Sequence, residues 1–325
     1  MNFALITIDN KHGLAGCIAD AMNKMLHEAI VKKFADGEMS VTVDNPTYWI
    51  GNKAVIIQST NNPVHEHIMQ VAFLAQELKH AGATQVIAVI PYFGYARHDA
   101  STIFGKPGHA QVLARLLEEA GVDELITVEL HKSSIKNFFS IPVRNIQLTD
   151  FIAHYIAESI DLSAGACLLA PDEGARERVQ TIAYKLVLDC VVLHKERYEP
   201  NKTRVIGMEG GDCADKAIIV VDDIIDTGGT AIKACAKIKE HGAREVYGLF
   251  VHPVLSGDAC ERIEASLFKK IFVSNTIELS AHTLNTKIHT FDITSLIVQE
   301  IYKSFATPAI ANHEVRYNAM HIRGD

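Results

Sequence analysis

A unit made of a helix, a glycine-containing turn and an apolar strand recurs three times along the chain. The apolar residues of each helix lie three and four positions apart, and each strand is β-branched and apolar on both faces. Such alternation is typical of parallel sheets covered by helices. We therefore predict an α/β fold with mainly parallel sheets, from helices at 69–78, 110–119 and 232–240 and strands at 85–91, 124–130 and 245–251.

The first and third copies are also alike in their letters, with AGATQVIAVIPYF beside HGAREVYGLFVHP. The likeness points to a duplicated domain, and 325 residues are enough for two domains. We predict two tandem units, 1–148 and 149–305, with a helix at 150–159 opening the second. The periodicity is lost after residue 305, so 306–325 is interpreted as a tail whose order is left open.

Composition narrows the class of protein. Hydrophobic residues at 48% and charged residues at 22% are typical of a globular chain, and apolar runs such as 86–90 and 217–221 are too short to span a membrane. The net charge of −8 argues against a general nucleic-acid surface. Six cysteines without a CxxC pair, and an N-terminus without a secretion signal, indicate reduced thiols in a cytoplasmic protein.

The segment AIIVVDDIIDTGGT, residues 217–230, is the most informative about function: we predict a buried strand that ends in Asp222 and Asp223, followed by a short turn into a helix. Its glycines let backbone N–H groups converge, its threonine hydroxyls can donate, and the dipole of the helix expected from 231 favours an anion, so 226–230 predicts a phosphate cradle. Asp222 and Asp223 would repel a bare phosphate and suit sugar hydroxyls or a metal. A helix cap explains one Asp or Thr, but not three Asp, two Thr and two Gly in nine positions.

This segment resembles the binding loop of phosphoribosyl diphosphate proteins, which have the type I phosphoribosyltransferase fold. Flanking motifs narrow the resemblance to the ribose-phosphate diphosphokinases, over roughly residues 25–300. The resemblance implies two phosphoribosyltransferase-like domains, in agreement with the duplication. It assigns ribose 5-phosphate to Arg197, Asp222, Asp223, Asp226, Thr227, Gly228, Gly229 and Thr230.

Two stretches of the N-terminal half, FADGE at 34–38 and PYFGYARHD at 91–99, resemble the ATP-contacting segments of the family. An arginine fork suits nucleotide phosphates, although an arginine considered alone is more often a surface ion-pair residue. The family commonly has Gln where this chain has His98, which leaves the nucleotide specificity open. The resemblance implies ATP contacts from Phe34, Asp36, Gly37, Glu38, Arg97, His98 and Asp99.

The stretch ELHKSSIKNFFSIP, residues 129–142, resembles the metal signature of the family. Relatives usually have Asp, Gln, Gly and Asp at the positions of Glu129, Ser134, Asn137 and Arg144, but the histidine is kept. The resemblance therefore implies Mg²⁺ at His131, and also at Asp172, which follows a predicted strand in LLAPDEGA. Considered alone, a histidine after a strand is usually structural, and Asp172 could equally cap a helix.

The stretch HKERYEPN, residues 194–201, resembles a mobile basic loop of the family, which implies that Lys195 and Arg197 are catalytic. Residues two apart project to the same side of an extended segment, although a KxR pair alone is usually solvated surface.

Together these motifs imply transfer of the diphosphoryl group of Mg-ATP to the 1-hydroxyl of ribose 5-phosphate, by a homo-oligomer that is a hexamer or built from dimers. Two alternatives remain at this point. One is a catalytically silent regulatory subunit, which loss of the basic loop or the cradle would favour. The other is a phosphoribosyltransferase, whose single domain does not account for the ATP-like motifs.

Overall fold

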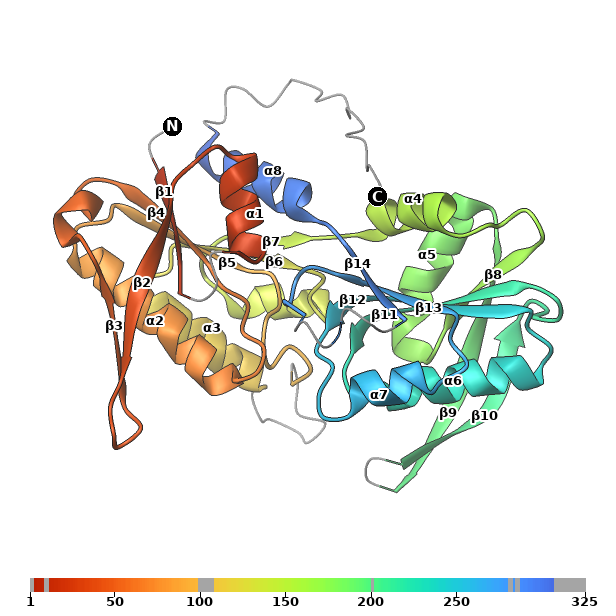
Figure 1. Ribbon diagram of the computed structural model, residues 1–325. Helices are drawn as coiled ribbons and strands as arrows, with labels where there is room; N and C mark the ends of the chain where they lie inside the picture. Colours follow the sequence, from red (N-terminus) through yellow and green to blue (C-terminus); the bar gives the residue numbers. More distant parts are fainter. Residues whose placement is uncertain are drawn as a thin grey trace.

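The computed structural model describes residues 3–8, 12–98, 108–199, 202–279, 283 and 287–306, with the side chains of 195–199 and 202–206 outside that description. The predicted contribution of Asp99 and the predicted tail beyond Ala306 lie outside the described residues. Two seven-stranded sheets stand side by side and carry helices on their faces (Figure 1).

The first sheet has the strand order β3-β2-β1-β4-β5-β6-β7, parallel except for the β2–β3 hairpin at its edge. Its strands are β1 (Phe3–Thr7), β2 (Leu26–Lys33), β3 (Met39–Val43), β4 (Lys53–Ile57), β5 (Gln85–Ile90), β6 (Glu124–Val128) and β7 (Val143–Ile146). The helices between them are α1 (Leu14–Ala21), α2 (Val64–His80) and α3 (His109–Glu119), with short 3₁₀ helices η1 (Pro46–Trp49) and η2 (Ser133–Phe138).

The second sheet has the order β10-β9-β8-β11-β12-β13-β14, again parallel except for one edge hairpin, β9–β10. Its strands are β8 (Ala166–Ala170), β9 (Asp189–Glu199), β10 (Lys202–Gly210), β11 (Ala217–Ile225), β12 (Glu245–Pro253), β13 (Lys270–Ser274) and β14 (Ile288–Phe291). The accompanying helices are α4 (Thr149–Ser159), η3 (Glu173–Ala175), α5 (Arg176–Leu186), α6 (Gly229–Glu240), α7 (Ala259–Glu264) and α8 (Thr294–Phe305).

Counted from its first strand, each sheet has the same order, with β8 to β14 repeating β1 to β7. The predicted α/β class with two mainly parallel, helix-flanked sheets is thus confirmed. The helices and strands predicted from the three repeated units are present as α2, α3, α6, β5, β6 and β12. One expectation was wrong: β11 does not end at the acidic pair but continues to Ile225, because Asp222, Ile224 and Ile225 still pair with β12.

Of the two helices that follow the last strands of the sheets, α4 packs within the second half and α8 packs against the first half. Helix α4 follows β7 and packs on α5, whereas α8 follows β14 and packs on α1, β6 and β7 (Figure 1). The ring of Phe305 stacks on that of Phe3, with centroids 4.3 Å apart. The units 1–148 and 149–305 stay a prediction, and α8 is a helix of the second unit that packs on the first sheet.

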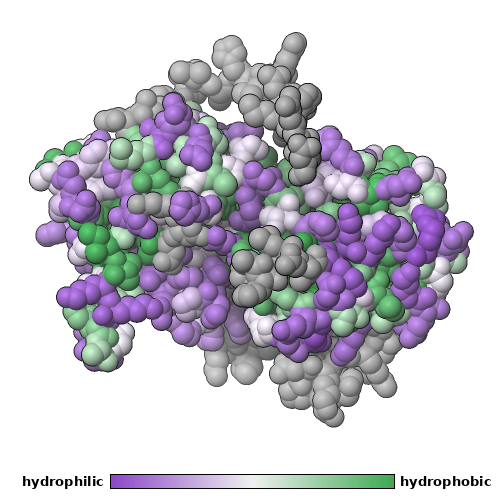
Figure 2. All heavy atoms as spheres, in the orientation of Figure 1, coloured by the Kyte–Doolittle hydropathy of each residue, from purple (hydrophilic) through white to green (hydrophobic). Residues whose placement is uncertain are grey.

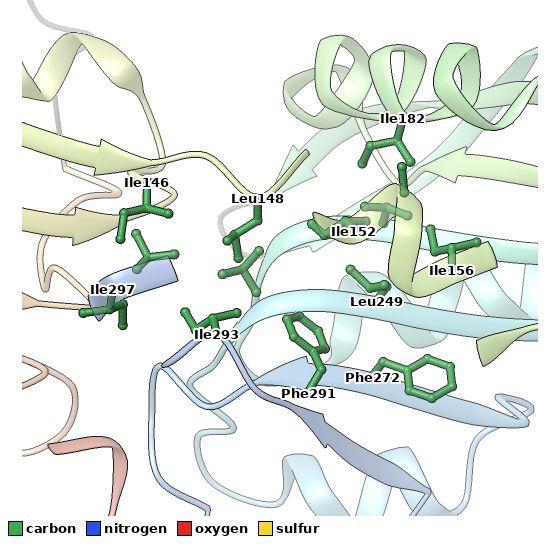
Figure 3. Close-up of a cluster of buried hydrophobic side chains, with 14 of the residues drawn as sticks. Ile146, Leu148, Ile152, Ile156, Ile182, Leu249, Phe272, Phe291, Ile293 and Ile297 are labelled. Carbon is green, nitrogen blue, oxygen red and sulfur yellow. The ribbon is translucent and has the colours of Figure 1, made fainter. Parts of the chain in front are cut away.

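One continuous apolar cluster therefore joins the two halves. It includes Ile146 and Ile297 beside the first sheet, Leu148 and Ile293 between the sheets, and Phe291 beside the second (Figure 3). The outer face of each sheet has a separate cluster, one containing Trp49 and the other containing Cys235. The shared cluster fixes how the strand ends of the two sheets meet.

Among the described helices, none is both long enough and apolar enough to cross a bilayer.

Candidate active site

A cavity of about 310 Å³ opens at the carboxyl ends of β8 and β11. These neighbouring strands connect onward to opposite sides of the sheet, β8 to β9 and β11 to β12, and such switch points are where open α/β sheets bind ligands. Two residues of the first half, Arg97 and His131, complete the wall. The lining within the described chain is Arg97, His131, Pro171, Asp172, residues 222–231 and Phe250.

The predicted cradle forms the turn from β11 into α6. Gly228 is the N-cap of α6 and has φ +70°, a left-handed conformation that favours glycine. Within the described chain, the backbone amides of residues 227–230 donate no hydrogen bond to another residue. Free N–H groups at the N-terminus of a twelve-residue helix form an anion site. The helix begins two residues earlier than expected, so Gly229 and Thr230 belong to its first turn.

Two carboxylates of β11 lie next to this cradle, Asp223 buried and Asp222 partly buried. Burial, together with the charges of Asp223 and Asp172, raises the pKa of Asp222 well above its ordinary value. Burial acts on Asp223 in the same direction, but the hydrogen bond from His131 and the charge of Arg178 outweigh it and lower the pKa of Asp223. Asp223 is therefore the ionised member of the pair, and Asp222 takes up a proton first.

Two residues from the end of β6 reach across to the second half. Nδ1 of His131 lies 2.7 Å from Oδ2 of Asp223. Glu129, whose side chain is 3% exposed, accepts a hydrogen bond from Arg178 at 3.3 Å, and Arg178 lies 3.9 Å from Asp222. The first half thus orients both carboxylates of the second.

Buried His252 on β12 makes a further contact between the halves. Its Nδ1 lies 3.0 Å from the hydroxyl oxygen of Thr276, and its Nε2 is within 3.3 Å of the carbonyl oxygens of Val128 and Glu129. These carbonyls precede His131 in the chain, so His252 anchors the segment from which His131 extends. Burial lowers the pKa of His252 to about 4, so its imidazole is neutral near pH 7.

Arg97 is placed by an ion pair with the cradle. Its Nη1 lies 2.8 Å from Oδ2 of Asp226. Burial would raise the pKa of Asp226, but hydrogen bonds from Ser256 and Arg97 outweigh it and lower that pKa. The predicted nucleotide arginine and the predicted phosphate loop therefore lie at one site, although they belong to different halves of the chain.

Asp172 lies at the same cavity and has the capping role considered for it. Its Oδ1 accepts the N–H of Gly174 at 3.1 Å, which caps η3. Its charge also raises the pKa of Asp222. The capped carboxylate of Asp172 still belongs to the cavity lining.

The donor set suits a Mg²⁺ ion that retains water or phosphate ligands. No described group of three or more His, Cys, Asp or Glu side chains is arranged to hold a metal by itself. Mg²⁺ is usually held by one or two carboxylates together with waters and substrate phosphates. If Nδ1–H of His131 donates to Asp223, its Nε2 lone pair remains for a metal, as is common for metal-binding histidines.

The other predicted ATP residues do not line this cavity. Phe34, Asp36, Gly37 and Glu38 form the turn of the β2–β3 hairpin, in which Oδ1 of Asp36 accepts the N–H of Glu38 at 3.1 Å. That hairpin and the β9–β10 hairpin project from opposite ends of the molecule (Figure 1). His98 adjoins Arg97, but its ring packs 5.4 Å from that of His109.

Lys195 and Arg197 lie on β9, and their side chains are outside the described part of the chain. Sequence reasoning missed Arg178, His252 and Phe250. The signal used for His131, a polar residue at the end of an apolar strand, was also present for His252 at the end of 245–253.

Comparison with known proteins identifies relatives along most of the chain. The family described as the N-terminal domain of ribose phosphate pyrophosphokinase matches residues 3–121, and the phosphoribosyl synthetase-associated domain matches residues 207–312. The ribose-phosphate pyrophosphokinase of Halalkalibacterium halodurans is 35% identical over 93% of this chain and 94% of its own length. That of Bacillus subtilis is 34% identical over 93% and 94%.

A solved structure of a protein with a related name has the same fold. The crystal structure of phosphoribosylpyrophosphate synthetase from Mycobacterium smegmatis matches this one with a TM-score of 0.85 at 27% identity, covering 94% of this chain and 99% of that chain.

Proposed function

Because this chain belongs to the ribose-phosphate pyrophosphokinase family, we propose that it transfers the diphosphoryl group of Mg-ATP to the 1-hydroxyl of ribose 5-phosphate. The products are 5-phosphoribosyl 1-diphosphate and AMP. The observation that carries the proposal is the cavity in which an anion cradle adjoins the carboxylate pair Asp222 and Asp223, with Arg97 and His131 from the first half completing the wall. A sugar phosphate needs both parts, because its phosphate seeks N–H donors and its hydroxyls seek carboxylates.

Ribose 5-phosphate binds with its phosphate on residues 226–230, where free amides and the dipole of α6 favour the anion. The carboxylates of Asp222 and Asp223 accept hydrogen bonds from the ribose hydroxyls. Their fixed positions, set by Arg178 and His131, present the 1-hydroxyl toward the wall formed by the first half. Alignment of this kind is the main requirement of phosphoryl-type transfer.

His131 and Asp172 are the residues that would hold Mg²⁺, because both line the cavity beside the carboxylate pair. When bound, the metal neutralises phosphate charge. Arg97 binds the nucleotide phosphates, for which it must exchange its ion pair with Asp226 or share its fork between the two.

The basic residues Lys195 and Arg197 stabilise the charge that develops on the reacting oxygens, and Arg197 also contacts the sugar phosphate. This assignment rests on the resemblance of residues 194–201 to the basic loop of the family.

The remaining ATP contacts come from a second copy of the chain. In this proposal the nucleotide site also includes Phe34, Asp36, Gly37, Glu38, His98 and Asp99. The first four form the turn of the β2–β3 hairpin, which projects away from the cavity of its own chain (Figure 1). Exposed apolar side chains at Met25, Ile30 and Tyr48 line one pocket beside β2, the first strand of that hairpin. Figure 2 shows hydrophobic surface over the same end of the molecule. The enzyme is therefore a homo-oligomer, a hexamer or an assembly of dimers.

A direct assay for AMP tests the proposed reaction. Purified protein with Mg-ATP should release AMP only when ribose 5-phosphate is present, with an equal amount of 5-phosphoribosyl 1-diphosphate. No AMP, despite binding of both substrates, would identify a silent regulatory subunit. Consumption of 5-phosphoribosyl 1-diphosphate together with a nucleobase would identify a phosphoribosyltransferase.

Replacing Lys195 with alanine tests the catalytic assignment. We expect kcat to fall by about a hundredfold or more, because one donor to the transition-state charge is lost. The fold should persist, which circular dichroism can check. The control is Lys237→Ala on α6, where the lysine side chain is 41% exposed and paired with Glu240 at 3.0 Å, and its kcat should be unchanged. Normal turnover by Lys195→Ala contradicts the assignment.

A further inference from the structure

Arg262 on α7 lies behind the cradle and holds one of its peptide groups. Its Nη1 donates to the carbonyl oxygen of Thr227 at 3.0 Å. A Cβ added at Gly229 would lie 3.4 Å from Nη2 of the same side chain. Arg262 is absent from the described cavity lining, whereas Thr227, Gly228 and Gly229 belong to it. The guanidinium therefore contacts the turn from the side away from the cavity.

The planarity of the peptide bond gives this contact a consequence inside the cavity. In a trans peptide the carbonyl and the following N–H point in opposite directions. Since the carbonyl of Thr227 points to Arg262, the N–H of Gly228 points away from α7, toward the cavity side of the turn. The left-handed φ of Gly228 then carries the chain from this peptide into the first turn of α6.

The charge of Arg262 strengthens the same peptide as a donor. A guanidinium stays protonated in proteins, and hydrogen bonds in a chain polarise one another. The carbonyl oxygen that accepts from Arg262 belongs to the Thr227–Gly228 peptide. Its hydrogen bond therefore makes the N–H of Gly228 a better donor to an anion. The carboxylate of Asp258 is 3.9 Å from Nη1, and both side chains are largely exposed at 41% and 68%, so this pair competes only weakly.

We propose that Arg262 is a positioning residue for the phosphate of the sugar phosphate, which it serves by fixing the Thr227–Gly228 peptide with its N–H toward the cavity. The inference rests on the proposed function, since it names how the cradle of that site is held. It adds a residue outside the cavity to the phosphate-binding machinery.

The test compares Arg262→Met and Arg262→Lys with the wild-type enzyme. Calorimetric titration gives the Kd for ribose 5-phosphate, and kinetics give the KM for each substrate. We expect Arg262→Met to raise the Kd and KM for ribose 5-phosphate about tenfold, as for loss of one charge-assisted hydrogen bond, with the KM for ATP changed less than about twofold. Arg262→Lys should recover part of the affinity, because an ammonium group can still donate to Thr227.

Arg244 provides a matched control. It is also an arginine of the second half whose guanidinium holds backbone carbonyls, those of Ala164 at 2.9 Å and Asp215 at 2.7 Å. Arg244→Met should leave the Kd for ribose 5-phosphate unchanged. Wild-type affinity in Arg262→Met, an equal rise in both KM values, or the same loss in Arg244→Met would overturn the inference. A wild-type protein that does not bind ribose 5-phosphate would overturn the proposed function first.

Discussion

Arg176 and Arg178 stand two residues apart at the start of α5, yet they belong to different electrostatic environments. Arg176 pairs with Glu173 and Glu209, whose side chains are 66% and 58% exposed. Arg178 pairs with Glu129, which is 3% exposed and which also accepts the N–H of Leu148. An exposed pair contributes about 0–1 kcal/mol, whereas removal of one partner from a buried pair costs about 3–5 kcal/mol.

We expect Arg178→Met to lower the free energy of unfolding by about 3 kcal/mol or more, because it leaves the carboxylate of Glu129 buried without its cation. Arg176→Met should lower it by less than about 1 kcal/mol. Urea denaturation of both variants measures the difference. Adding Glu129→Gln to Arg178→Met should restore part of the loss, and equal effects of the two arginine variants would contradict this account.

His252 should make stability depend on pH. Its folded-state pKa of about 4 lies below the ordinary value of 6.5, because burial disfavours the imidazolium. As the pH falls below about 6.5, the unfolded chain binds a proton that the folded chain does not bind, so stability falls. The titration of His252 alone should lower the free energy of unfolding by about 2 kcal/mol at pH 5 relative to pH 8.

The measurement is the free energy of unfolding between pH 8 and pH 5 for the wild type and His252→Gln. Glutamine keeps a donor for the carbonyl oxygens but does not titrate, so the variant should lose less stability on acidification. His154→Gln is the control, because the side chain of His154 is 73% exposed on α4. Parallel pH profiles for wild type and His252→Gln would show that His252 does not titrate as its burial implies.

At the residue level, the sequence predicted a site residue where a side chain with suitable chemistry follows or ends an apolar strand. Asp172, Asp222 and His131 each stand at or near the end of an apolar strand, and all three line the cavity. His252 also stands near the end of an apolar strand, but the sequence does not indicate its partners or those of Arg178. Arg178 meets Glu129 across 49 positions and His252 meets Val128 across 124, and a single sequence does not specify contacts of that range.

At the level of elements, periodicity predicted α2, α3, α6 and the strands after them, because each buries one face or both faces on a sheet. The end of β11 was misplaced because two aspartates were taken to end a strand. They remain in it, since backbone pairing with β12 continues and each charge has a partner, Arg178 or His131. Tertiary contacts here outweigh local propensity.

The β2–β3 hairpin shows the opposite limitation. Its turn was recognised as a motif, and the structure shows an Asx-type hydrogen bond from the N–H of Glu38 to Asp36 and a left-handed Gly37, as a turn requires. Turn chemistry therefore accounts for part of the sequence of this segment. Its exposed Phe34 has no such explanation and is consistent with contact to a second copy.

At the scale of the molecule, helix α8 of the second half packs on the first half. Helices α4 and α8 each follow the last strand of one sheet, and α4 packs on α5 while α8 packs on α1, the helices that occupy equivalent places in the two repeats. The sequence repeat predicted the duplication but not this return of α8, because a periodic apolar face does not specify which helix it packs on. The return of α8 places Ile297 (Figure 3) and Ile301 in the cluster shared by both sheets. The first half therefore depends on a helix from the second half to bury its inner face.

We therefore expect the two halves to unfold in one transition, even when only one of them is weakened. Ile297→Ala removes a fully buried side chain of α8 and should lower the free energy of unfolding by about 2–5 kcal/mol. Two probes report the outer clusters separately: the fluorescence of Trp49, the single tryptophan, and the reactivity of the buried thiols of Cys167, Cys213 and Cys235. Both urea transitions should shift together, and Ile238→Ala on α6, in the outer cluster of the second half, should shift both as well. A variant that moves only the probe of its own half would show that the halves fold independently and that α8 does not couple them.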